Sequence, residues 1–177
     1  MYKRQIYLTG YRCTGKTSTG KKLAELLKIP FVDADIYLSD KYNMTINNMV
    51  SKQGWESFRE KESIVLKEIS KQDNCVIATG GGVILKEENI TPMKKCGIVI
   101  WLQATPDTIK KRIVQDETTK DSRPSLTPKG LLDEIEETLN KRRPLYKKSM
   151  NFAVNTDNVE IDRLCSRIIK TIKQLKK

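Results

Sequence analysis

Short apolar runs alternate with longer amphipathic segments along the whole chain. Five runs have the length and composition of buried β-strands, namely residues 5–9, 31–33, 75–79, 97–102 and 152–154. Apolar positions three or four apart predict helices between them, over residues 16–28, 57–69, 106–113, 131–141 and 159–175. Strands that alternate with helices in this way predict an α/β fold, a three-layer α/β/α arrangement around a short parallel sheet.

The composition narrows the range of partners. The chain has 177 residues, so we expect one domain spanning residues 1–177. Its 33 Lys and Arg against 22 Asp and Glu leave a formal net charge of +11, which attracts anions such as nucleic acids and phosphorylated small molecules. Only 6% of residues are aromatic, and no ladder of aromatic and basic residues is visible. We therefore expect a phosphorylated small molecule rather than nucleic acid.

The cysteines and the lengths of the apolar runs indicate the cellular compartment of the protein. The four cysteines, at positions 13, 75, 96 and 165, form no CxxC pair, which suits free thiols in a reducing environment. The first five residues are polar, and no run approaches the roughly 20 apolar residues of a membrane span. These observations predict a cytoplasmic protein with no membrane partner, and we expect it to be a monomer.

The strongest local motif is residues 10–17, Gly-Tyr-Arg-Cys-Thr-Gly-Lys-Thr, which fits G-x-x-x-x-G-K-[ST] between a predicted strand and a predicted helix. Gly10 and Gly15 allow backbone N–H groups to turn toward phosphates, and the helix N-terminus adds a positive dipole end. Lys16 is expected at the β- and γ-phosphates and the Thr17 hydroxyl at Mg²⁺. The predicted ATP-binding residues of this segment are Arg12, Cys13, Thr14, Gly15, Lys16, Thr17 and Ser18.

Two further segments follow predicted strands, at the sheet edge where open α/β sheets bind ligands. Asp33 and Asp35 are two residues apart, so they lie on the same side of an extended chain, where one can support Mg²⁺ and the other can hold a substrate hydroxyl. The alternative is an acidic helix cap. Gly80, Gly81 and Gly82 allow backbone to approach a ligand closely, or they form a simple turn. Histidine is absent, so the commonest general base is not available.

The motifs occur in an order that resembles the shikimate kinase family over essentially the whole chain. After the phosphate loop and the Asp-x-Asp come Phe-Arg-x-x-Glu at 58–62, the triple glycine, Arg123-Pro124 and Arg-Arg-Pro-Leu-Tyr at 142–146. The resemblance implies a P-loop kinase fold of the nucleoside-monophosphate-kinase type. It implies a substrate-binding helical segment at about 34–60 and a lid at about 113–128. The implied reaction is ATP-dependent phosphorylation of the 3-hydroxyl of shikimate, on the route to chorismate and aromatic amino acids.

The resemblance assigns the nucleotide and metal roles. Lys16 would bind the nucleotide phosphates and Thr17 would bind Mg²⁺, supported by Asp33. Arg123 would reach the phosphates from the lid, and Arg112 would lie near the adenine, although it could also be a solvated surface residue. The chain departs from the family pattern at Cys13, where glycine is common, and by an extra residue, Ser125, between Pro124 and Leu126.

The resemblance also assigns the acceptor roles. Asp35 would orient or deprotonate the accepting hydroxyl, which places it with Lys16 and Arg123 in the expected catalytic set. Arg59 and Arg142 would bind the shikimate carboxylate, since guanidinium and carboxylate match as bidentate partners. Residues 80–82 would line the same pocket.

Some alternatives remain open at this point. Arg143 competes with Arg142 for the second carboxylate contact. A different small-molecule P-loop kinase, acting on gluconate or a nucleoside monophosphate, would share the loop but need other acceptor residues. A protein that binds ATP or nucleic acid without catalysis would use the net positive charge.

Overall fold

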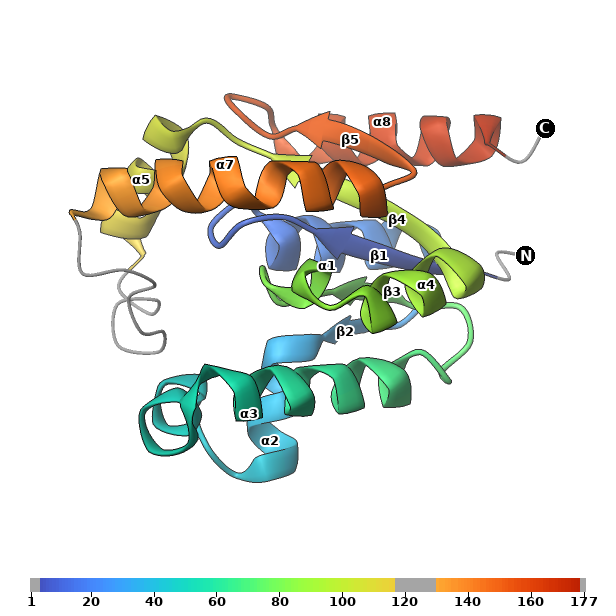
Figure 1. Cartoon of the computed structure of the whole chain (residues 1–177). Coiled ribbons are helices and arrows are strands. Elements are labelled where there is room, and N and C mark those ends of the chain that lie inside the picture. The colour runs from blue at the N-terminus through green and yellow to red at the C-terminus, as the bar shows by residue number, and fades with distance from the viewer. Residues whose placement is uncertain (1–3, 117–129, 176–177) are drawn as a thin grey trace.

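The molecule is built on one sheet of five parallel strands, in the order β2-β3-β1-β4-β5 (Figure 1). The structure is a computed structural model that describes residues 4–116 and 130–175. The five predicted strands are all present, at β1 (Gln5–Thr9), β2 (Phe31–Asp33), β3 (Val76–Ala78), β4 (Gly97–Gln103) and β5 (Phe152–Asn155). The all-parallel pairing confirms the sheet that the alternating pattern predicted.

Helices cover both faces of this sheet, which gives the expected three layers (Figure 1). The elements between strands are α1 (Lys16–Leu27), α2 (Ala34–Tyr42), α3 (Ile46–Ile69), the 3₁₀ turn η1 (Val83–Leu85), α4 (Glu87–Cys96), α5 (Pro106–Gln115), α7 (Leu131–Ser149) and α8 (Ile161–Gln174). Alternate residues of β1 separate the two cores: Ile6 and Leu8 pack with α1 and α8, whereas Tyr7 packs with α3, α4 and α7.

The strand register brings three loops to the same edge of the sheet. Leu8 of β1 pairs with Ala78 of β3, and Asp33 of β2 pairs with the same Ala78. The segments that follow β1, β2 and β3 therefore begin side by side, and they are the phosphate loop, the Asp-x-Asp segment and the triple glycine. Parallel strands place such loops at one edge because their carboxyl ends point the same way.

Several helices differ from the predicted boundaries. The sequence pattern did not predict α4, because it is polar and contains Pro92, yet Ile90 and Met93 bury against the core. The helix predicted over residues 57–69 forms the part of α3 that follows a kink at Gly54, and Thr45 caps the part that begins at Ile46. The helix predicted to end at Lys141 continues to Ser149 through Pro144. Tyr146 explains this extension, because its ring is fully buried and stacks on Trp101 with centroids 5.4 Å apart.

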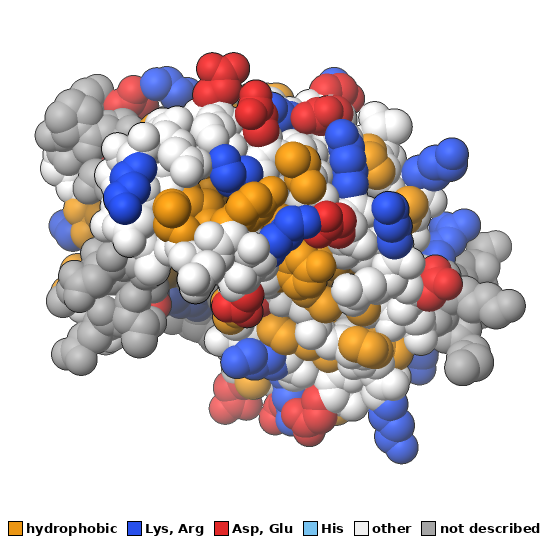
Figure 2. Space-filling view, turned by 90° about the horizontal axis from the view of Figure 1, so that it is seen from below, with side chains coloured by type: hydrophobic (Ala, Val, Ile, Leu, Met, Phe, Trp, Pro, Cys, Tyr) orange, Lys and Arg blue, Asp and Glu red, His pale blue; other side chains and the backbone are white. Residues whose placement is uncertain are grey.

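The side of the molecule formed by α2 and α3 carries both signs of charge (Figure 2). Lys and Arg side chains there lie beside Asp and Glu side chains, with hydrophobic side chains between them (Figure 2). In residues 4–116 and 130–175, no helix has the length and apolar character needed to cross a membrane.

Candidate active site

The phosphate loop joins β1 to α1 in the conformation that its glycines allow. Gly10 has a φ of +142°, and a Cβ there would lie 2.5 Å from the carbonyl oxygen of Leu102 in the neighbouring strand. A side chain at this position would therefore clash with backbone that cannot move aside. The loop is closed on itself by Thr14, whose hydroxyl donates to the Tyr11 carbonyl at 2.8 Å.

Lys16 lies inside this loop. Its side chain is buried, and Nζ donates hydrogen bonds to the carbonyl oxygens of Gly10, at 2.9 Å, and Tyr11, at 2.8 Å. The ammonium group is thus held where the loop curves. Substituting Lys16 would remove these loop contacts as well as a charge, which the sequence alone did not indicate.

Thr17 and Asp33 meet beside the loop. The Thr17 hydroxyl donates to Asp33 Oδ2 at 2.7 Å, and the other carboxylate oxygen of Asp33 accepts from the backbone N–H groups of Asp35 and Ile36. Asp33 therefore caps α2, as the alternative interpretation of the Asp-x-Asp segment predicted, and it also contacts Thr17. A hydroxyl and a carboxylate oxygen at this separation are hard oxygen ligands, which suit Mg²⁺.

The metal prediction also fits the surrounding residues. In the described parts of the chain, His, Cys, Asp and Glu form no group of three or more that could enclose an ion. Mg²⁺ is usually bound through one or two carboxylates together with substrate phosphates and water, and it does not need an all-protein cage. Thr17 and Asp33 match this kind of site.

A groove, which we call the nucleotide groove after the role predicted for its residues, runs from the phosphate loop to the segment after β5. It is lined by Cys13, Thr14, Gly15, Ser18, Thr19, Arg112, Gln115, Asp116, Thr156, Val159, Ile161 and Leu164. Arg112 connects its two walls, because Nη1 donates to the carbonyl of Cys13 at 3.2 Å and Nη2 donates to the carbonyl of Thr156 at 2.7 Å. Arg112 is thus a bridging residue at the groove rather than a solvated surface residue.

A second pocket lies on the other side of the loop and contains the predicted acceptor residues. It is lined by Tyr11, Arg12, Asp35, Ile46, Trp55, Phe58, Arg59, Glu62, Gly80, Gly81, Gly82 and Arg142. We call it the acceptor pocket. A Cβ on Gly80 would lie 2.3 Å from Glu62 Oε1 and 2.9 Å from Asp35 Oδ1, and a Cβ on Gly82 would lie 2.3 Å from the Arg59 guanidinium. Side chains of the pocket thus pack directly on the backbone of Gly80 and Gly82, and a side chain at either position would displace the ends of Glu62, Asp35 or Arg59.

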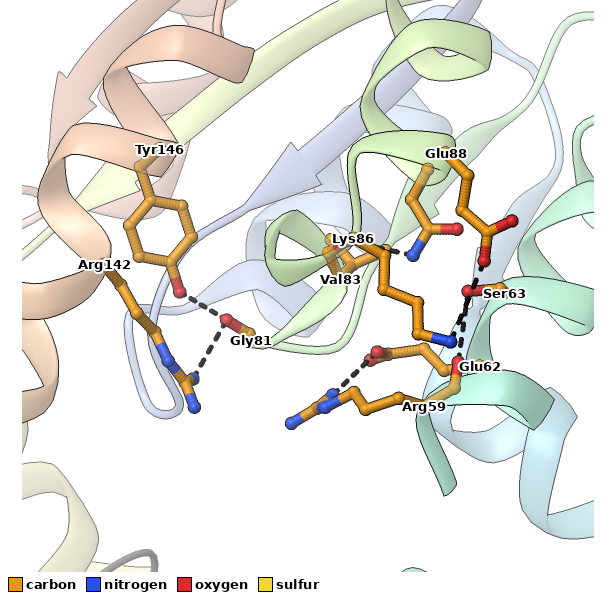
Figure 3. Close-up of polar contacts among 10 residues, drawn as sticks. Arg59, Glu62, Ser63, Gly81, Val83, Lys86, Glu88, Arg142 and Tyr146 are labelled. Atoms are coloured by element: carbon orange, nitrogen blue, oxygen red, sulfur yellow. Dashed lines mark hydrogen bonds and ion pairs between the residues drawn. The ribbon is translucent and has the colours of Figure 1, made fainter. Parts of the chain in front are cut away.

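Arg59 and Glu62 form an ion pair on one face of α3. Arg59 Nη1 donates to Glu62 Oε2 at 2.6 Å (Figure 3). The guanidinium lies over the rings of Phe58, 4.8 Å from the centroid, and Trp55, 5.2 Å from the centroid. Burial raises the pKa of the Glu62 carboxyl; the Arg59 charge opposes this shift and the Asp35 charge adds to it. Glu62 Oε1 is buried and accepts no hydrogen bond among the described residues, so the pair is only partly satisfied.

Arg142 approaches the pocket from α7. Its Nη1 donates to the Gly81 carbonyl at 3.2 Å, and the Tyr146 hydroxyl donates to the same oxygen at 2.5 Å. Figure 3 shows the guanidinium groups of Arg59 and Arg142 pointing toward one another from opposite sides of the pocket. Arg143 lines a separate groove beside Trp101, so Arg142 is the one of the two that lines the acceptor pocket.

The structure also brings in residues to which the sequence analysis assigned no role. Trp55 and Phe58 pack on the guanidinium of Arg59, Tyr146 holds the Gly81 carbonyl, and Glu134 pairs with Arg12. A signal existed only for Phe58 and Tyr146, which belong to the quoted motifs. Arg123 and most of the predicted lid, from residue 117 onward, lie outside the described residues, while residues 113–115 end helix α5.

The comparisons with known proteins agree with this geometry. Residues 12–173 match the family model of shikimate kinase. The chain belongs to the shikimate kinase family. Shikimate kinase 2 of Photorhabdus laumondii is 42% identical over 151 residues, which cover 85% of each protein. Shikimate kinase of Rhodopirellula baltica is 35% identical over 167 residues, which cover 94% of this chain and 89% of that protein.

Solved structures of the family share the fold. Shikimate kinase from Acinetobacter baumannii in complex with shikimate has a TM-score of 0.91 and 31% identity, covering 98% of this chain and 94% of that one. Shikimate kinase from Bacteroides thetaiotaomicron has a TM-score of 0.86 and 31% identity, covering 97% of this chain and 99% of that one. The predicted fold class, an α/β P-loop kinase, is thereby confirmed, and ATP-dependent shikimate phosphorylation is the activity that the family supports.

Proposed function

We propose that this chain transfers the γ-phosphoryl group of ATP to the 3-hydroxyl of shikimate, with the acceptor bound in the pocket between α3 and α7. The observation that carries the proposal is the joint placement of Asp35, Arg59 and Arg142 around one cavity that the phosphate loop also lines. Two guanidinium groups call for an anionic acceptor, and a carboxylate beside them calls for a hydroxyl. Shikimate has both groups.

Arg59 and Arg142 bind the acceptor carboxylate in this proposal. Arg59 is held by Glu62 and by two aromatic rings, so its guanidinium loses little further freedom when a ligand arrives. Arg142 is held by the Gly81 carbonyl. A planar guanidinium pairs with a planar carboxylate through two parallel hydrogen bonds, which fixes the orientation of the ring that carries the carboxylate.

Asp35 orients the accepting hydroxyl and takes its proton as the oxygen attacks the γ-phosphorus and ADP leaves. Phosphoryl transfer depends mainly on positioning and charge stabilisation, so the carboxylate has only to hold the hydroxyl in line. The chain contains no histidine, and Asp35 is the carboxylate that lines the pocket at the start of α2.

ATP occupies the other side of the phosphate loop. Lys16 and the backbone of residues 12–18 bind the phosphates in this proposal, Arg112 borders the adenine, and Arg123 is proposed as a further phosphate contact. The Arg12 side chain turns to the acceptor side, so its role in ATP binding would come from its backbone N–H. Thr17 and Asp33 hold Mg²⁺, which neutralises phosphate charge when bound.

The environment of the enzyme is a further part of the proposal. We place it in the cytoplasm as a monomer that binds neither nucleic acid nor membranes. All four cysteines lie in the described residues and none of them forms a disulfide there, which supports a reducing compartment. Light scattering coupled to size-exclusion chromatography would test the monomer, and a dimer mass would contradict it.

The activity is tested by a coupled ADP-release assay across shikimate, gluconate and nucleoside monophosphates, with ATP and with or without Mg²⁺. Shikimate should give the fastest Mg²⁺-dependent release, and mass spectrometry should find one phosphoryl group added to it. Faster turnover with gluconate or a nucleotide would refute the substrate assignment. Lys16→Ala serves as the control for contaminating kinases, because it removes the phosphate-binding ammonium.

A further inference from the structure

One face of α7 carries a row of residues spaced four apart that points at the pocket loops. The row consists of Glu134, Thr138, Arg142 and Tyr146, and this spacing places all four on the same side of a helix. Arg142 and Tyr146 contact the triple glycine through the Gly81 carbonyl. Glu134, at the N-terminal end of the row, reaches the phosphate loop instead.

Glu134 forms a buried ion pair with Arg12. Glu134 Oε1 accepts from Arg12 Nη2 and, at 3.4 Å, from the Tyr11 hydroxyl. The exposed fractions of the two charged side chains are 2% for Glu134 and 12% for Arg12. The first turn of α7 is therefore tied to the phosphate loop through a carboxylate that water hardly reaches.

Arg12 faces the acceptor pocket rather than the nucleotide groove. It lines the pocket together with Arg59 and Arg142, and it is absent from the lining of the groove that contains Cys13, Thr14 and Arg112. Among the described residues, three guanidinium groups thus line the pocket. Arg59 and Arg142 point toward one another across it (Figure 3), whereas Arg12 belongs to the phosphate loop.

The Arg12–Glu134 ion pair is not arranged in a way that would add much to the stability of the fold. Arg12 Nε is buried and finds no hydrogen-bond acceptor within residues 4–116 and 130–175. Removing two charges from water costs about as much as their attraction returns unless all their polar atoms are satisfied. An arginine has many rotamers, and pairing with a fixed carboxylate restricts it to a few of them. The pairing with Glu134 therefore serves to fix the position of the Arg12 guanidinium.

We propose that Glu134 is a positioning residue that holds Arg12 on the wall of the acceptor pocket, beside the phosphoryl group during its transfer. This inference rests on the proposed function. Arg59 and Arg142 account for the acceptor carboxylate, which is present before and after the reaction. The third guanidinium then meets the charge that moves from ATP to the acceptor, where cations stabilise the transition state.

The placement predicts which kinetic constant changes. Glu134→Ala frees the Arg12 side chain, so kcat should fall on the order of 10- to 100-fold, while KM for shikimate changes little. Arg12→Ala should lower kcat at least as much. The double variant should be no slower than Arg12→Ala alone, because Glu134 has nothing left to position. Glu134→Gln keeps the shape without the charge and should fall between wild type and Glu134→Ala.

The experiment measures kcat and KM for shikimate at saturating ATP, with thermal unfolding of each variant to confirm that it is folded. Glu136→Gln, an exposed residue on the same helix, is the matched control and should keep wild-type kinetics. If Glu134→Ala does not fold, the isosteric Glu134→Gln decides the question. Wild-type kcat in a folded Glu134 variant, or losses that multiply in the double variant, would overturn the proposal.

Failure of the proposed function gives a different result. A wild-type enzyme that releases no ADP with shikimate would refute the substrate, and the same variants would then be compared with the acceptor that the wild type does phosphorylate. A wild-type enzyme that is active on shikimate but whose kcat is insensitive to Glu134 would refute the positioning role alone.

Discussion

Arg59→Ala tests the acceptor pocket most directly. The substitution removes a guanidinium that is 13% exposed in its side chain, pairs with Glu62 at 2.6 Å and lies over two aromatic rings. The acceptor carboxylate would keep only Arg142 as a cationic partner of the predicted pair. Truncating one partner of a desolvated charge pair costs about 2–5 kcal/mol. That range corresponds to a loss of shikimate affinity of roughly 30-fold to several-thousand-fold.

The protonation state of Glu62 determines how large the loss of shikimate affinity in Arg59→Ala should be. Burial raises the pKa of its carboxyl and the Arg59 charge opposes the shift, so removing Arg59 raises that pKa further. A Glu62 carboxyl that takes up a proton no longer repels the acceptor carboxylate. We therefore expect the affinity loss to be smaller at acidic pH and to grow as the pH rises. Arg59→Lys keeps the charge but not the bidentate geometry and should show an intermediate loss.

The assay is a titration of shikimate at saturating ATP and at several pH values, followed by ADP release. Lys61→Ala is the matched control, because this cation lies on the same helix but donates to Ser57 Oγ at 2.7 Å and does not line the acceptor pocket. The control should change affinity by no more than about twofold. Unchanged shikimate affinity in a folded Arg59→Ala enzyme would show that the pocket does not bind the carboxylate.

Three further predictions concern single residues. Lys16→Ala should lower kcat by about two orders of magnitude or more, because it removes the ammonium that neutralises the phosphates. It should also lower the melting temperature, since Lys16 Nζ donates hydrogen bonds to two loop carbonyls. Wild-type turnover in this variant would contradict the role assigned to Lys16. Asp35→Asn should reduce kcat by about 100-fold or more and leave ATP affinity nearly unchanged. Single-turnover kinetics and nucleotide titration measure the two quantities. An equal loss of kcat and of ATP affinity would argue against proton transfer to Asp35. Glu62→Gln removes a carboxyl whose folded-state pKa lies above its ordinary value of 4.5, so the stability of the wild type relative to this variant should fall as the pH rises from about 4.5 through that raised pKa. Denaturant unfolding of both proteins over this pH range measures the trend. If the free energy of unfolding of the wild type rose relative to that of Glu62→Gln with increasing pH, the pKa of Glu62 would be lowered in the folded state instead of raised.

The parts of the site that depend on neighbours in the chain were predictable from sequence. The phosphate loop is an example, because the fixed positions of its motif, Gly10, Gly15, Lys16 and Thr17, are neighbours in the chain. The hydrogen bonds from Lys16 Nζ to the loop carbonyls were not predicted. The family resemblance placed Thr17 and Asp33 at one predicted metal site, and in the structure the two side chains are in contact. Buried strands were visible as short apolar runs that need cover on both faces.

The sequence did not predict every helix. Polar composition and Pro92 hid α4, and Pro144 suggested that α7 ended early. Local propensity opposed both helices, and packing outweighed it, as the buried Met93 and Tyr146 show.

The sequence alone thus determined the chemistry that this chain has available: a loop for phosphates, two carboxylates after a strand, arginines near a triple glycine, and no histidine. The tertiary structure decided which of these groups meet. Arg142 and Arg143 are adjacent in sequence, but a helix rotates about 100° per residue, so only the packing of α7 places Arg142 in the pocket. Arg12 and Glu134 are 122 residues apart, and no local rule relates them. They come together because the sheet brings the phosphate loop to the edge along which α7 packs.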